Sequence, residues 1–158
     1  MALLSSAFKV TNYTALLGWL VLFSIPLWPA QGRTLVLALI VTLLCIAYSY
    51  FIFLGKRHDA PDARPRGSFF SLAGVISLFK SPRVVLAGWI HYLAFDLLVG
   101  RWETIDAQHR GIPHLAVVPC LFLTFMFGPA GWLAYVTLRA VHARSIATKP
   151  FSAPQQPA

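Results

Sequence analysis

The sequence predicts an all-α integral membrane protein with a four-helix bundle, and three observations lead to this fold class. Of the 158 residues, 58% are hydrophobic and only 11% are charged, whereas ordinary soluble domains carry roughly 25% charged residues. Four apolar runs are each near the ~20 residues that a helix needs to cross the hydrocarbon core. Backbone polar groups must be satisfied internally in lipid, so four helices are favoured over strands.

The four apolar runs form one membrane domain over residues 1–149. The expected spans cover residues 13–30, 34–55, 84–102 and 114–138. The linker 58–67 is rich in proline and charge. The segment 150–158 has no hydrophobic pattern, so we expect a disordered tail there.

A short amphipathic segment follows the linker. One helical face carries Phe69, Leu72, Ile76 and Phe79. The segment is too short to cross a membrane. We therefore expect a short helix that lies in the membrane interface and ends before Pro82.

The basic residues predict the orientation in the membrane. With four spans, both terminal segments and the central loop lie on one side and carry ten of the 13 lysine and arginine residues; the other side carries Arg33, Arg101 and Arg110. Both termini are therefore expected in the cytoplasm. The first run has no clear small-x-small cleavage site and is interpreted as a retained span. No Arg/Ser-rich transit peptide precedes it, so we expect the inner membrane of a bacterium.

The net charge of +8 does not indicate a nucleic-acid partner, because the basic residues lie between apolar runs rather than along one face. Such positions suit anionic membrane lipid as the partner. Cys45 and Cys120 lie in apolar runs without a CxxC motif or a His/Cys cluster, so neither a metal site nor a cofactor is expected. Haem is disfavoured because His91 and His114 would lie at different depths.

Asp96 is the most informative residue, because it lies inside an apolar run. An ionisable group at bilayer depth costs about 2.5 kcal/mol or more, which makes a functional role the default hypothesis. The alternative is that Asp96 anchors a helix pair. Tyr92 and Glu103, at spacings of four and seven residues, share its stripe on the third helix.

His91 faces away from Asp96 on the same helix, by about 140° around the axis and about 7.5 Å along it. The two side chains are expected to line opposite edges of one apolar cavity if the fourth helix closes it near Phe125 and Pro129. Pro129 leaves the Phe125 carbonyl without its helical donor, which makes this carbonyl a polar wall of the cavity.

A polar cluster follows the third span. Arg101, Glu103 and Asp106 lie at its outer end, where a solvated ion-pair cluster is the structural alternative to a binding role. His114 begins the fourth run, beside a carbonyl that Pro119 leaves without its helical donor.

Several motifs from this part of the chain occur together. They are Gly88–Trp102, Asp106, Gly111–His114, Val118–Cys120 and Phe127–Gly131. Within the first, His91, Asp96 and Arg101 form a His-x4-Asp-x4-Arg element. The block resembles the abscisic-acid-deficient-four family, the plant neoxanthin-synthase family. The resemblance extends in architecture over nearly the whole chain, with four spans and a long loop between the second and third.

The resemblance implies carotenoid chemistry, as in the redox-neutral isomerisation of an epoxide to an allene, or a related modification of an isoprenoid ring. Such a reaction needs an acid for the epoxide oxygen and a base for a carbon-bound proton. Asp96 and His91 are the candidate catalytic pair, with Arg101 fixing a ring hydroxyl or Asp96 itself. The expected substrate-binding set is completed by Tyr92, Glu103, Asp106 and His114.

Two other functions remain open from the residues alone. The first is a noncatalytic membrane subunit or assembly factor that binds a lipid or a partner enzyme. The chain could also form a homo-oligomer. A small transporter is the second alternative. Transporters usually show broken helices at the membrane midplane, and here only the fourth run is interrupted.

Overall fold

The computed structural model describes residues 2–27, 30–59 and 67–147, which form six α-helices and no strand within these ranges. The α-helices are α1 (Ala2–Phe23), α2 (Ala30–Ser49), α3 (Leu72–Leu78), α4 (Pro82–His109), α5 (His114–Phe127) and α6 (Pro129–Ala147). Short helical turns connect some of them: η1 (Ile25–Leu27), η2 (Tyr50–Leu54) and η3 (Gly55–His58). The expected tail 150–158 and most of the linker 58–67 lie outside the described residues.

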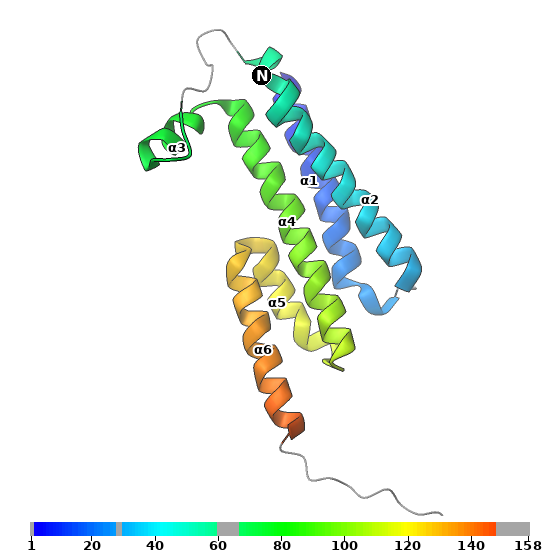
Figure 1. Cartoon of the computed structure of the whole chain (residues 1–158). Coiled ribbons are helices and arrows are strands. Elements are labelled where there is room, and N and C mark those ends of the chain that lie inside the picture. Colours follow the sequence, from blue (N-terminus) through cyan, green and yellow to red (C-terminus); the bar gives the residue numbers. More distant parts are fainter. Residues whose placement is uncertain (1, 28–29, 60–66, 148–158) are drawn as a thin grey trace, which may run out of the picture.

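Helix α4 is the centre of the molecule and contacts α1, α2, α5 and α6 (Figure 1). Its buried side chains, among them Ile90 and Leu97, meet Trp19 and Leu22 of α1 and Leu121 of α5 in one apolar core. Within the described ranges, two helical segments are long and apolar enough to cross a membrane, Gln31–Arg57 and Pro82–His109. The all-helical fold is thus confirmed, while the other expected spans stay predictions.

The expected single helix through 114–138 is wrong, because the chain breaks at Gly128. This residue has φ +50°, a conformation that favours glycine, and its N–H donates to the Thr124 carbonyl at 2.9 Å to end α5. Pro129 then begins a new helix. Helix α6 runs back alongside α5, so the two form a helical hairpin (Figure 1).

Side-chain contacts confirm that the chain reverses. On α5, Thr124 bonds Glu103 of α4, whereas seven residues beyond the break the Tyr135 hydroxyl bonds Asp106, closer to the C-terminal end of α4. A helix continuing past Gly128 would instead have moved toward the start of α4. The 14-residue α5 is about 21 Å long, half the length of the 28-residue α4, so the hairpin covers only one half of it.

The reversal removes the basis for placing both termini on one side. The described ends of the chain lie at opposite ends of the molecule (Figure 1), and Arg139 and Arg144 move to the end that holds Arg110. The described basic residues then divide five and five. One end has Lys9, Lys56, Arg57, Lys80 and Arg83, and the other has Arg33, Arg101, Arg110, Arg139 and Arg144. This balance no longer predicts an orientation.

The short helix expected after the linker is present as α3. It begins after Ser71, whose hydroxyl accepts a hydrogen bond from the Gly74 N–H at 3.1 Å, so Phe69 lies before the helix and not on its expected face. Phe69 and Leu72 are both exposed. At the start of α4, the buried Arg83 pairs with Asp59 at 2.9 Å and donates to the Phe51 carbonyl. These contacts fasten η2 and the residue that follows η3 to α4. They also satisfy the buried Arg83 charge, which would be costly without a partner.

Candidate functional site

Asp96 lies at the turn of the α5–α6 hairpin. Asp96 is 8% exposed. Its carboxyl faces Gly128 so closely that a Cβ at position 128 would lie 2.9 Å from the Oδ1 atom. The Oδ2 atom is buried and has no hydrogen-bond partner among the described residues. Burying a carboxyl oxygen without a hydrogen-bond partner costs free energy, so a purely structural residue would rarely retain it.

Tyr92 lies one helical turn before Asp96 and adjoins its carboxyl. The Tyr92 hydroxyl donates to the Phe125 carbonyl at 3.2 Å. As expected, this carbonyl has no backbone donor four residues later, because Pro129 supplies no N–H. Tyr92 thus joins α4 to the end of α5, and its hydroxyl, which donates to Phe125, lies beside the Asp96 carboxyl.

Glu103 is a second buried carboxyl on the same stripe of α4, about 10.5 Å along the axis from Asp96. It is 0% exposed and accepts a hydrogen bond from the Thr124 hydroxyl at 2.9 Å. Its Oε2 atom is also buried without a partner among the described residues. The expected stripe of Tyr92, Asp96 and Glu103 is therefore present, and the hairpin covers it.

Asp106 and His114 tie helices together. One Asp106 oxygen accepts from the Tyr135 hydroxyl at 2.7 Å and from Arg110 at 2.9 Å, and it lies 3.6 Å from Arg139. These contacts hold α6 against the end of α4. The His114 ring donates to the Phe23 carbonyl at 3.1 Å and so links α5 to the end of α1.

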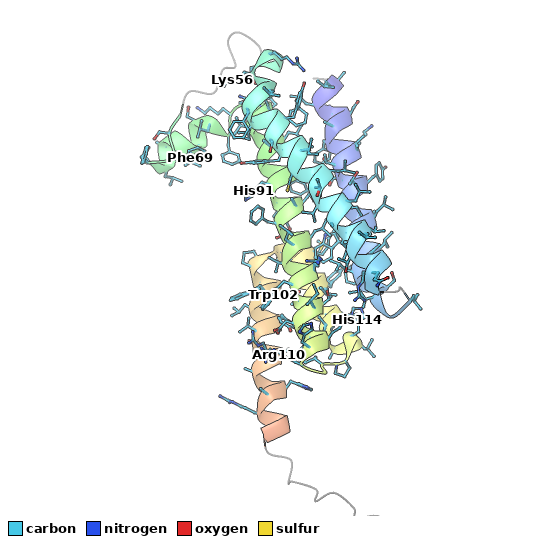
Figure 2. The ribbon with its side chains drawn as sticks, turned by 45° about the vertical axis from the view of Figure 1, so that its right-hand side comes forward. Lys56, Phe69, His91, Trp102, Arg110 and His114 are labelled. Atoms are coloured by element: carbon cyan, nitrogen blue, oxygen red, sulfur yellow. The ribbon has the colours of Figure 1, made fainter. Side chains whose placement is uncertain are left out.

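Arg101 is half-buried and forms no ion pair with Asp96 in the described structure. Its backbone carbonyl accepts from the Thr104 hydroxyl at 2.7 Å. The neighbouring Trp102 meets the Tyr135 ring edge-on, with centroids 5.6 Å apart, on the side of α4 that α6 covers (Figure 2). Arg101 thus does not fix Asp96, and at 100° per residue it faces about 140° away from it on α4.

His91 does not share a cavity with Asp96. Its side chain is exposed, stacks on Phe95 with ring centroids 4.4 Å apart, and lies 5.4 Å from the Tyr48 ring of α2. Figure 2 shows it in the half of α4 that the hairpin leaves uncovered. Two surface cavities, of about 330 and 650 Å³, touch neither residue. Neither is the expected apolar cavity around both residues, and α2 rather than the fourth run lies beside His91.

Sequence reasoning missed Thr124 and Tyr135, which donate from the hairpin to Glu103 and Asp106. A signal for both was present. The Gly128-Pro129 pair is typical of a helix end, and a reversal there turns the next residues back toward the end of α4. Thr124 is then a lone hydroxyl in an apolar run, one turn before the break.

The fold and the site define a class: an all-helical membrane protein whose central helix carries two buried carboxyls beneath a helical hairpin. The chain matches the family described as ABA DEFICIENT 4-like over residues 6–135 and belongs to it. The matched segment includes Tyr92, Asp96, Glu103, Thr124 and Gly128. Membership relates the chain to carotenoid-linked membrane proteins. No curated protein and no solved structure matches the chain.

Proposed function

We propose that this protein catalyses a redox-neutral isomerisation of a carotenoid or related isoprenoid, with Asp96 as the proton-transferring group. The observation that carries this proposal is the buried Asp96 Oδ2 atom, which has no hydrogen-bond partner among the described residues. A carboxyl in an apolar site tends to stay neutral, and a neutral carboxylic acid can protonate an oxygen of a bound ligand.

One carboxyl suffices for the whole reaction. Asp96 donates its proton to the epoxide or ether oxygen while the C–O bond breaks, and the bonding electrons go to that oxygen. The resulting carboxylate then removes a proton from the neighbouring carbon, and the C–H electrons form the new double bond. The acid is regenerated and no oxidant is consumed. This assignment leaves His91 outside the reaction, in agreement with its contacts to Phe95 and Tyr48.

The first experiment is pigment extraction from a host that makes epoxy-carotenoids, with and without this gene. We expect a new pigment of unchanged mass and altered absorption, because an isomerisation conserves composition. His91→Gln should keep conversion within about threefold, since a group that transfers no proton contributes little to the rate. Conversion lost in that variant would restore His91 as the base. A product that differs in mass would refute the isomerisation.

A transporter is the second candidate, and one observation favours it. The helix break at Gly128 lies beside a buried acid, and transporters form their binding sites from interrupted helices. The two functions differ in their need for a sealed compartment. Purified protein in detergent micelles should still convert pigment if it is an enzyme, whereas a transporter would show no product there. The inner-membrane location, oligomers and a partner enzyme stay predictions.

A further inference from the structure

An apolar groove lies between α1 and α4 in the half of α4 that the hairpin leaves uncovered. A cavity of about 330 Å³ opens there, within the range of small-molecule sites. Its walls include Phe8 and Lys9 of α1 and Val85 and Trp89 of α4. Val85 and Trp89 are large exposed side chains.

The face of α4 that lines the cavity continues toward Asp96, whereas the lining of the cavity itself ends at Trp89. Val85, Trp89, Tyr92 and Asp96 are separated by four, three and four residues, so they lie on one stripe of the helix. The Trp89 and Tyr92 ring centroids are 5.4 Å apart, so the aromatic surface is continuous between the cavity and the site. From Val85 to Asp96 the stripe is about 16 Å long.

Helix α1 forms the other wall. The Phe8 ring lies 6.0 Å from Trp89, and the Trp89 indole N–H donates to the Asn12 side chain at 3.2 Å. Further along α1, Trp19 meets Phe125, with centroids 5.3 Å apart. The end of α5 therefore meets α1 on the Asp96 side of the cavity.

We propose that this groove binds the apolar chain of one elongated ligand, whose single reactive polar end reaches Asp96. The proposal rests on the proposed function and adds where the rest of the substrate lies. Its class is a polyene or isoprenoid with one oxygen-bearing end, because the stripe carries apolar and aromatic side chains from Val85 to Tyr92 and an acid only at the hairpin turn. The half-length of the hairpin leaves the groove open to lipid for lateral entry.

Retinol, an apolar polyene with one terminal hydroxyl, is a suitable probe for purified protein in detergent micelles. Val85→Phe fills the groove and should weaken retinol binding at least about tenfold, as overpacking does. Thr42→Phe is the matched control, because Thr42 lines a separate apolar cavity on α2. It should change binding less than about twofold. Equal effects of the two variants would mean that retinol only partitions into the micelle, and would overturn the proposal.

Energy transfer locates the bound retinol independently of any blocking variant. Trp89→Phe should remove far more tryptophan-to-retinol transfer than Trp132→Phe, whose indole is exposed on α6. Similar losses would place retinol elsewhere. If dioleoylphosphatidylglycerol displaces retinol and Lys9→Gln prevents the displacement, the groove is a phospholipid site and the proposal fails.

The proposed function fails separately from the groove. Asp96→Asn keeps a polar end group at the hairpin turn, so it should bind retinol within about threefold of wild type. Full pigment conversion by Asp96→Asn together with weak binding by Val85→Phe would leave the groove standing and remove the acid role. Lost conversion by Asp96→Asn together with unaltered retinol binding by Val85→Phe would leave the acid role standing and remove the groove.

Discussion

Asp96→Asn should lower pigment conversion roughly 100-fold or more while the protein accumulates in the membrane as before. Asparagine keeps the shape of the side chain and can still accept hydrogen bonds, but it has no acidic proton to transfer. The contact with Gly128 is retained, because the amide occupies nearly the same volume. The measurement is the rate of product formation per amount of purified protein.

An interhelical anchor would behave differently from an acid. In that case asparagine would preserve the link between α4 and the hairpin, and conversion would stay near the wild-type rate. Retinol affinity and the thermal midpoint in detergent serve as controls, since both report a folded protein with an intact groove. Full conversion in the variant would eliminate Asp96 as the acid.

Gly131→Ala should destabilise the hairpin by about 1–3 kcal/mol, which is the usual cost of overpacking. A Cβ at position 131 would overlap the backbone of Thr124, so α5 and α6 would have to separate. Their separation would also shift the turn at Gly128 away from Asp96, so conversion should fall with stability. The measurement is the thermal midpoint of the purified protein in detergent.

Gly32→Ala is the matched control for this prediction. A Cβ at position 32, near the start of α2, would meet nothing within 4 Å. Alanine favours helix over glycine by about 1 kcal/mol, so this variant should be unchanged or slightly more stable. If Gly131→Ala were as stable as Gly32→Ala, the close approach of α5 and α6 would be refuted.

The α4 stripe could be predicted because it depends only on helical periodicity. The spacings of Tyr92, Asp96 and Glu103 place them on one face whatever surrounds the helix, and the structure confirms that face. The same periodicity showed that His91 faces away from Asp96. It could not show which helix would lie there, and α2 brings Tyr48 to that side.

The hairpin could not be predicted from hydropathy, because an apolar run has the same hydropathy whether it continues or turns back. Residues 114–138 are long enough for a span, so their hydropathy predicts one continuous helix. The direction of α6 depends on the positive φ of Gly128 and on the tertiary contact between Tyr135 and Asp106. The sides of Arg139 and Arg144 follow from the direction of α6, so the expected excess of basic residues on one side depends on the same contact.

The central claim is that α6 turns back at Gly128, which places Asp96 at a hairpin turn within the membrane. Labelling of single cysteines with a membrane-impermeant maleimide in intact cells tests this directly, after Cys45 and Cys120 are replaced by serine. Lys56→Cys, Gln108→Cys and Ala143→Cys mark the ends of the relevant helices. We predict that positions 108 and 143 label from the same side and position 56 from the opposite side. Labelling of position 143 together with position 56 would contradict the hairpin and restore a continuous fourth span.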